Sequence, residues 1–365
     1  MKVFFFFDDF SGNRPVWLNV LWPHFKVIKE STDTVFLPKP LVDKRLLDQS
    51  RLLARGEELW KMIVDGRIIR QQVLNELDPN EPNVLLVWAL NGRDVKWTSV
   101  LNPIWSAFSH RVLVIGDAVQ PSHASKKLLE RFDRITCFCR DLGEEFEQSV
   151  GVRTLYWPAH TDVLNFQSIH DYRPIDLIVV GRRDKKMHGP LHRHFNSRNR
   201  DRVFLDFVTR TQMDINCEDE FILLMTMYNR SKASFCYEAS KVERFQGRSP
   251  LMGRWIHAWT SGCTVFGRRP IGSGVSEQMD WPESTIELPD DPRDAIQLIE
   301  DILSDEASMK QRRNRNVIEA LERHDTRYRL RDLFVDLKLP LPSHLQNGLA
   351  ELNRSSAAIR AMDNT

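Results

Sequence analysis

The sequence predicts an α/β protein with two domains of similar size. Short runs rich in Val, Ile and Phe recur without polar alternation, which is typical of strands covered by helices on both faces. Stretches of helical length separate these runs, so successive strands are expected to lie parallel and to be joined by crossover helices. A chain of 365 residues is long enough for about two such domains.

The first expected strand is residues 3–7, a run of Val and Phe that the acidic residues Asp8 and Asp9 end. This run is too short for a secretory signal, which needs roughly 7–15 apolar residues, or for a membrane span of about 20. Later strands are expected at 84–88, 111–115, 135–138, 176–180, 233–237 and 264–266. Helices are expected within 41–77 and at 292–303.

The boundary between the domains is expected near residue 160. A strand ends within residues 152–162, where Pro158 interrupts it, and a new strand–helix series begins at Ile175. This gives an N-terminal domain of residues 1–160 and a second domain of residues 161–343. Residues 344–365 place leucines at helical intervals and predict a final helix and tail, either packed on the protein or exposed for a partner.

Composition limits the partners and the compartment. Lys and Arg number 51 and Asp and Glu number 50, so a net charge of +1 argues against bulk binding of nucleic acid or of an anionic membrane. The five cysteines contain no CxxC pair, so neither a zinc ribbon nor a disulfide framework is supported. A reduced, cytoplasmic protein without a membrane span is expected.

A basic segment lies after the strand that opens the second domain. Residues 182–202 carry eight Lys and Arg against two Asp, directly after Gly181. At the carboxyl end of a parallel strand, a glycine lets backbone approach a ligand, and the following helix N-terminus favours negative charge. A phosphate or diphosphate would fit there; a solvated loop and helix face is the alternative.

The segment 248–266 is the most informative part of the chain. Leu251, Trp255 and Trp259 form an apolar helical face, Gly262 stands where a helix cap is expected, and residues 263–266 enter a strand. The basic, glycine-rich loop 267–274 follows. This unit resembles the donor-binding segment of GT-B glycosyltransferases, the group with two Rossmann-like domains, and is most similar to family-4-like and spore-coat-maturation-type enzymes of glycosyl transferases group 1.

The resemblance implies two Rossmann-like domains that face each other across a cleft, with the last helix returning to the first domain. It implies an enzyme that moves a sugar from a nucleotide-diphosphate donor to an acceptor hydroxyl without a metal or other cofactor. UDP-sugar is the default donor, with GDP and dTDP close behind; the acceptor would occupy the first domain and the cleft. The residues that would meet the donor diphosphate are Gly181, Arg182, Arg183, Lys186, Arg254 and Arg268.

This chain departs from the family at two glutamates. In family-4-like enzymes the first lies near the donor sugar and the second holds the ribose hydroxyls; alignment on Gly262 puts Ser249 and His257 at these positions. Both side chains can still bond a hydroxyl. Glu277, just past the glycine-rich loop, is a possible substitute acceptor for hydroxyl groups.

An inverting transferase would need a general base, and Asp8, Asp9 and Asp117 each follow an apolar strand. The structural alternative for each is a turn or a helix cap, and a retaining enzyme would need no such base. His188, His192 and His194 form an HxxxHxH pattern, but basic neighbours oppose a cation, so no metal site is expected.

Other functions remain open from the sequence. A nucleotide-sugar epimerase or a phosphorylase-like enzyme would share the fold. A non-catalytic GT-B protein that binds nucleotide-sugars or has a structural role is the alternative from another class, supported by the missing glutamate pair. Nucleic-acid binding ranks third, because the basic segment has no recognition motif beside it.

Overall fold

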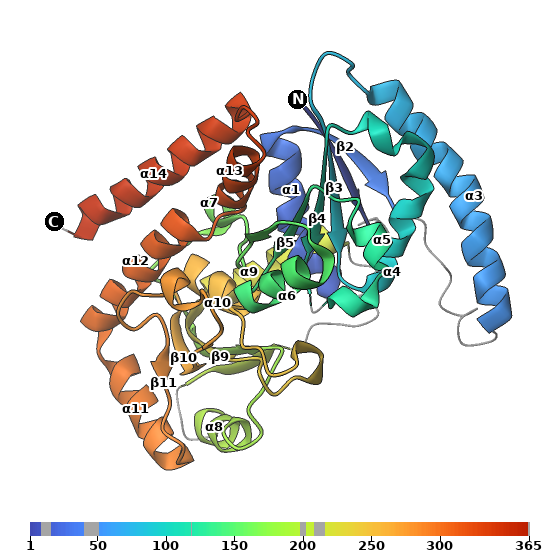
Figure 1. Ribbon diagram of the computed structural model, residues 1–365. Coiled ribbons are helices and arrows are strands. Elements are labelled where there is room, and N and C mark those ends of the chain that lie inside the picture. Colours follow the sequence, from blue (N-terminus) through green and yellow to red (C-terminus); the bar gives the residue numbers. More distant parts are fainter. Residues whose placement is uncertain (9–15, 40–50, 118, 198–201, 208–215, 364–365) are drawn as a thin grey trace. The chain divides into compact units, whose positions relative to one another are not determined.

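The computed structural model describes residues 1–8, 16–39, 51–117, 119–197, 202–207 and 216–363. The chain divides into two compact units (Figure 1). Unit 1 contains Met1–Asp9, Lys29–Trp157 and Leu333–Pro342, and unit 2 contains Phe10–Ile28, Pro158–Asp332 and Ser343–Thr365. Asp9 lies outside the described residues.

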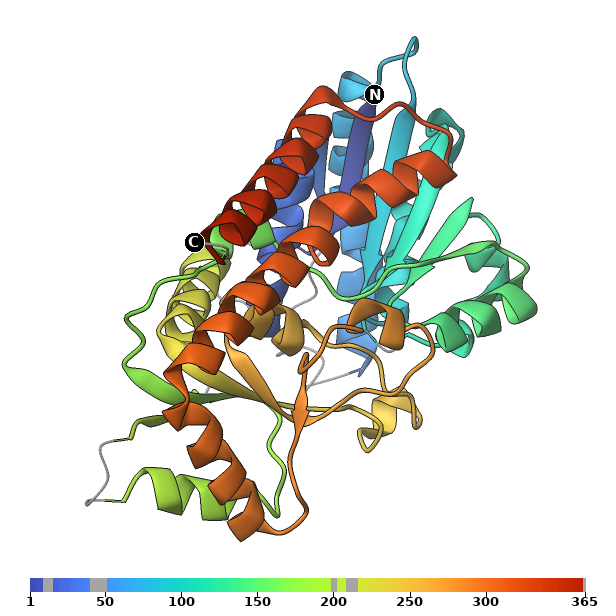
Figure 2. The same cartoon turned by 90° about the vertical axis from the view of Figure 1, so that its left-hand side faces the viewer.

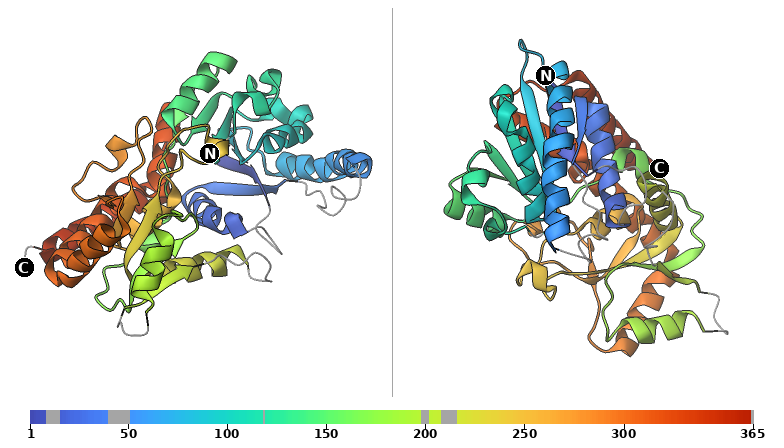
Figure 3. Two further views of the ribbon diagram at one scale, coloured as in Figure 1. Left: turned by 90° about the horizontal axis from the view of Figure 1, so that it is seen from below. Right: turned by 90° about the vertical axis from the view of Figure 1, so that its right-hand side faces the viewer.

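Unit 1 is built on a six-stranded parallel sheet with the order β2-β1-β3-β4-β5-β6. Its strands are β1 (Lys2–Phe7), β2 (Asp33–Pro38), β3 (Asn83–Ala89), β4 (His110–Ile115), β5 (Arg134–Cys137) and β6 (Thr154–Tyr156). Its helices are α3 (Arg51–Glu76), α4 (Gly92–Trp97), η2 (Thr98–Ala107), η3 (Pro121–His123), α5 (Lys126–Leu129) and α6 (Arg140–Val150). Figure 3 shows the long helix α3 beside this sheet, where it packs on η2 and β2.

Strand β1 explains why the sheet of unit 1 is buried on both faces. Phe4 and Phe6 enter one apolar core, whereas Phe5 and Phe7 pack on Trp88 from the opposite face. All four phenylalanines are at most 1% exposed. The run without polar alternation is therefore a strand covered on both sides, as the sequence predicts.

Unit 2 is built on a five-stranded parallel sheet with the order β11-β10-β9-β7-β8. Its strands are β7 (Ile175–Val180), β8 (Phe204–Phe207), β9 (Ser231–Tyr237), β10 (Thr264–Arg268) and β11 (Ile286–Glu287). Its short helices are η1 (Val16–Leu21), α7 (Val163–Phe166), α8 (His188–Phe195), η4 (Glu243–Phe245), α10 (Gly253–Thr260) and η5 (Ser276–Gln278). Its longer helices are α9 (Cys217–Asn229), α11 (Pro292–Ser304), α12 (Glu306–Arg323) and α14 (Ser343–Asp363).

The two remaining helices span the division between the units. Helix α1 (Trp22–Ser31) ends in unit 1, and α13 (Thr326–Asp336) passes into unit 1 at Leu333.

The C-terminal helix corrects one expectation. Helix α14 does not return to the first domain: it belongs to unit 2, where it packs along α12 (Figure 2). The segment that joins unit 1 is Leu333–Pro342, which ends α13 and leads into α14. Asp336 of this segment forms ion pairs with Arg134 and Arg153, and these contacts hold the segment in unit 1.

All the predicted strands are present, and three further strands were not predicted. β2 is half-exposed, β8 is four residues long and β11 is two residues long. The five cysteines are buried free thiols. No helix in the described part of the chain is long and apolar enough to cross a membrane.

Candidate functional site

The candidate site lies at the carboxyl edge of the unit 2 sheet. Strands β7, β9 and β10 are parallel neighbours, so the loops that follow them emerge at the same edge. Ligands of open α/β sheets bind outside this edge. The loops begin at Gly181, Glu238 and Arg269.

Gly181 and Arg254, which are far apart in the sequence, meet at this edge. Gly181 has φ +76°, a left-handed conformation that favours glycine. A Cβ atom at this position would lie 3.5 Å from Nη2 of Arg254, which projects from the first turn of α10. Nη1 of Arg254 is buried and has no hydrogen-bond partner in the described part of the chain. A buried guanidinium nitrogen of this kind is able to bind an anionic group.

Arg182 adds a second cation to the same edge. Its Nη1 donates to the backbone oxygens of Tyr237 and Glu238, each at 2.9 Å, so the side chain spans the ends of β7 and β9. Burial, together with the charges of Arg254 and Arg244, lowers the pKa of Arg182 to about 10. Positive charge is concentrated here, and a bound anion would relieve the repulsion.

Ser249 also reaches this edge, together with a carboxylate that was not among the expected residues. Ser249 Oγ donates to Glu238 Oε2 at 2.9 Å and accepts from the backbone N–H of Ile271 at 3.2 Å. Glu238 directly follows strand β9, the same position that singled out Asp8 and Asp117 after their strands. The sequence therefore held a signal for Glu238.

His257 lies one turn beyond Arg254 on α10, on a buried face of the helix. The residue is 5% exposed, and its ring packs edge-on against Phe221. Burial, assisted by the charge of Arg254, lowers the pKa of His257 to about 4, so the imidazole is neutral at pH 7. These contacts describe a core residue, and a hydroxyl contact to the donor stays a prediction.

Three of the expected cations have other surroundings. Arg183 is ion-paired with Asp206 at the end of β8, and Arg268 is ion-paired with the exposed Asp290. The side chain of Lys186 is exposed, and its backbone N–H donates to Asp184. Arg183 also donates to the backbone oxygen of Gly181 at 3.1 Å, whereas the contacts of Lys186 and Arg268 do not bring them together with Arg182 and Arg254.

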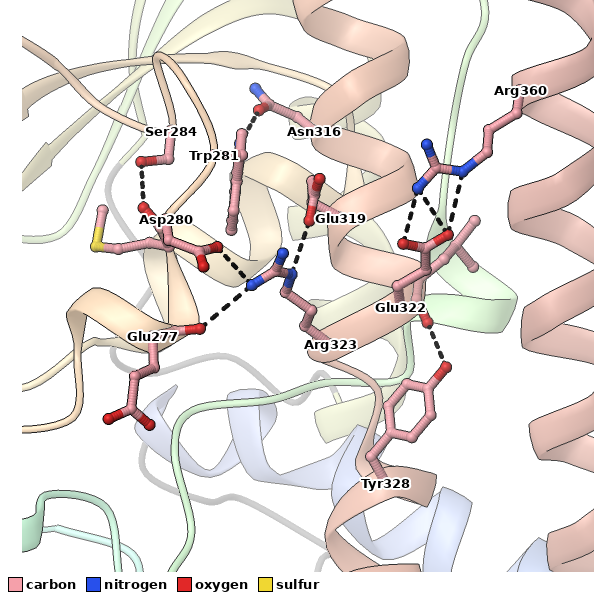
Figure 4. Close-up of polar contacts among 12 residues, drawn as sticks. Glu277, Asp280, Trp281, Ser284, Asn316, Glu319, Glu322, Arg323, Tyr328 and Arg360 are labelled. Carbon is pink, nitrogen blue, oxygen red and sulfur yellow. Dashed lines mark hydrogen bonds and ion pairs between the residues drawn. The ribbon is translucent and has the colours of Figure 1, made fainter.

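Glu277 lies on a loop that is fastened to helix α12. Figure 4 shows its carboxylate pointing away from Arg323, which donates instead to the Glu277 backbone oxygen at 3.2 Å and to Asp280 at 2.6 Å. Trp281 Nε1 donates to Asn316 of α12 at 2.9 Å and fixes the same loop. These contacts hold the loop on α12.

In unit 1, two of the three candidate bases are described. Asp8 is buried after β1, and its carboxylate contacts Lys39 Nζ at 2.9 Å. Lys39 also pairs with Asp94, whose carboxylate accepts from backbone N–H groups at the start of α4. Asp117 is half-buried in the loop that follows β4.

The histidine pattern has acidic neighbours that the sequence did not indicate. His188 Nε2 lies 3.1 Å from Asp206, and His194 Nε2 lies 3.1 Å from Glu300. In the described part of the chain, no three His, Cys, Asp or Glu side chains gather in a way that would hold a metal ion.

Comparisons with known proteins identify the fold. No protein-family model matches the chain, and no curated protein sequence matches it. The structure is similar to Anabaena Alr3699/HepE in complex with UDP and glucose, at 11% identity and a TM-score of 0.52, over 93% of this chain and 99% of that chain. It is also similar to an alpha-glucosyltransferase in complex with UDP and a 13-mer DNA, at 11% identity and a TM-score of 0.55, over 93% of this chain and all of that chain.

A glycosyltransferase from Rickettsia africae is similar at 10% identity and a TM-score of 0.52, over 92% of this chain and 98% of that chain. These neighbours are GT-B glycosyltransferases, so the resemblance stated from the sequence is confirmed for the fold. The chain has the GT-B fold, with a Rossmann-like sheet in each unit.

Proposed function

We propose that the chain is a nucleotide-sugar-dependent glycosyltransferase whose donor binds at the carboxyl edge of the unit 2 sheet. The observation that supports this most directly is the arginine pair at that edge. Arg254 has a buried, unpartnered Nη1 among the described residues, and Arg182 has a pKa lowered by burial and neighbouring arginines. An anionic group would satisfy both side chains.

A nucleoside diphosphate is the anion that suits this edge. Planar guanidinium groups bind phosphate oxygens in pairs, and the N-terminus of α10, whose first turn carries Arg254, adds partial positive charge. The same groups would stabilise the negative charge that develops on the diphosphate when the sugar leaves, without need of a metal ion. UDP is the preferred nucleotide because the HepE and alpha-glucosyltransferase neighbours contain it.

For the acceptor side, unit 1 offers Asp117 as the candidate base of an inverting reaction. Asp8 is less suited to this role, because its carboxylate is ion-paired with Lys39, which also pairs with Asp94. Asp8 and Asp117 follow β1 and β4, which are separated by β3 in the sheet. A retaining reaction would need neither Asp8 nor Asp117 as a base.

Release of the nucleotide tests the proposal. Wild-type protein incubated with UDP-glucose, GDP-mannose or dTDP-glucose is expected to release one nucleoside diphosphate, even if water is the only acceptor. Arg254→Met removes a charged contact of about 1.5–3 kcal/mol, so the apparent affinity for that donor should fall roughly 10–100-fold. Arg360→Met, which breaks an exposed ion pair with Glu322, is the matched control and should behave as wild type.

Binding without release would favour a non-catalytic nucleotide-sugar-binding protein. Equal effects of the Arg254 and Arg360 substitutions would reject the site.

A further inference from the structure

Glu238 contacts Arg182 through its backbone oxygen, and its carboxylate is linked to the loop after β10 through Ser249. Glu238 Oε1 accepts from Ser240 Oγ at 2.6 Å, and Oε2 accepts from the Ser240 backbone N–H at 2.5 Å. Ser249 Oγ donates to Oε2 at 2.9 Å from the following loop. These donors fix the orientation of the carboxylate, because the two serines hold it from different parts of the chain.

The loop after β10 completes this arrangement. The backbone N–H of Gly272 donates to the Ser249 oxygen at 2.8 Å, and Ile271 donates to Ser249 Oγ. A Cβ atom at position 272 would lie 2.6 Å from that oxygen, so only a glycine allows this close approach. The carboxylate therefore lies where the loops after β9 and β10 meet.

The carboxylate of Glu238 is ionised at pH 7. Burial raises its pKa, but the hydrogen bonds from Ser240 and Ser249 and the charge of Arg182 together hold the pKa below the usual range. Arg182 donates to the backbone oxygen of Glu238, at 2.9 Å, and to that of Tyr237. Among the described residues, Oε1 accepts the hydrogen bond from Ser240 Oγ, and a carboxylate oxygen has capacity for two such bonds.

A nucleotide-sugar offers the complementary groups. Its diphosphate is anionic and suits the arginine pair, whereas the sugar attached to that diphosphate carries hydroxyl groups that donate hydrogen bonds. An ionised carboxylate accepts such bonds strongly, and it repels a phosphate. The change from cationic to anionic side chains along this edge therefore matches the change from diphosphate to sugar along the donor.

We propose that Glu238, held by Ser240 and Ser249, accepts hydrogen bonds from hydroxyl groups of the donor's sugar and selects donors that carry those hydroxyls. This inference rests on the proposed function. A structural role, in which the carboxylate only closes the turn at Ser240, is the competing explanation. The two differ in whether the sugar itself contributes to affinity through Glu238.

The test compares a nucleotide with its own sugar conjugate. Dissociation constants are measured by calorimetry for UDP and UDP-glucose, GDP and GDP-mannose, and dTDP and dTDP-glucose, and the pair that wild type binds most tightly is used. Glu238→Gln keeps the shape of the side chain and removes its charge. Glu243→Gln, an exposed carboxylate on the same loop, is the control.

Glu238→Gln is expected to weaken binding of the sugar conjugate roughly 10–100-fold, as for loss of a hydrogen bond to a charged group, and to leave the free nucleotide unaffected within about threefold. Equal weakening of both ligands, or of neither, would overturn the proposal for Glu238 while the nucleotide site stands. If wild type binds no nucleotide, the proposed function fails and the inference fails with it.

Discussion

Replacing Arg327 with methionine removes a cation that two buried carboxylates share in unit 2. Arg327 Nη1 lies 3.1 Å from Asp162 Oδ1 and 3.0 Å from Asp325 Oδ1, and both aspartate side chains are fully buried. Loss of one partner from such a cluster leaves uncompensated buried charge and costs about 3–5 kcal/mol of unfolding free energy. At ~2–4 °C per kcal/mol, the melting temperature should fall by roughly 6–20 °C.

The size of this defect should depend on pH in a defined direction. Burial raises the pKa of Asp325, Arg327 opposes that rise, and Asp162 adds to it. Without Arg327 the pKa of Asp325 rises further. A carboxyl group whose pKa is raised by folding stabilises the protein at low pH and loses that contribution as pH rises through the folded pKa. The difference between variant and wild type should therefore be larger at pH 8 than at pH 5.

Urea denaturation followed by tryptophan fluorescence at these two pH values measures the effect. Methionine keeps an unbranched aliphatic side chain beside Gly348 of α14, where a Cβ atom would lie 2.6 Å from Arg327 Cδ. Arg360→Met breaks the exposed pair with Glu322 and should change stability by less than about 1 kcal/mol. A defect in Arg327→Met no larger than that control, or one that is larger at pH 5, would refute the reasoning.

Two further predictions concern acid stability and helix ends. Burial lowers the pKa of four histidines. The pKa is about 3 for His24 and His324 and about 4 for His257, and that of His160 is well below its normal value. The neutral histidines contribute fully to stability above pH ~6.5, and this contribution is lost as pH falls. The free energy of unfolding should therefore fall by on the order of 5 kcal/mol between pH 7.5 and 5.5. An unchanged free energy of unfolding over this range would contradict the prediction. Gly262→Ala should cost about 1–3 kcal/mol more than Gly151→Ala in chemical denaturation. Both glycines have positive φ, but only the Cβ at 262 meets a neighbour, 2.5 Å from Arg313 Cγ, so equal losses would count against this packing.

Local patterns predicted the strands and the helix end at Gly262 well. Because β1 is buried on both faces, it is a run of phenylalanines without alternating polar residues. This pattern can be recognised from the sequence. Gly262 has φ +68° after α10, as its position after an apolar helical face predicts. β8 and β11 are short, and their residues carry no comparable pattern.

The site was less predictable, because charge along the sequence does not determine ion pairing in space. Arg183 and Arg254 are both basic residues near the same strand end. Asp206 forms an ion pair with Arg183, whereas a buried nitrogen of Arg254 has no hydrogen-bond partner among the described residues. Glu238 follows an apolar strand in the sequence, but its hydrogen bond from Ser249 is visible only in the structure. The two residues are separated by eleven positions, and only folding brings their side chains together.

The most direct test of a nucleotide donor site is a thermal-shift panel of UDP, GDP, dTDP, ADP and CDP at millimolar concentration. A nucleotide present at about 100 times its dissociation constant adds ~2.7 kcal/mol of stability, which corresponds to roughly 5–10 °C. One nucleotide is expected to raise the melting temperature by this amount, and Arg254→Met should reduce the shift whereas Arg360→Met preserves it. A flat panel on folded wild-type protein would contradict the donor site.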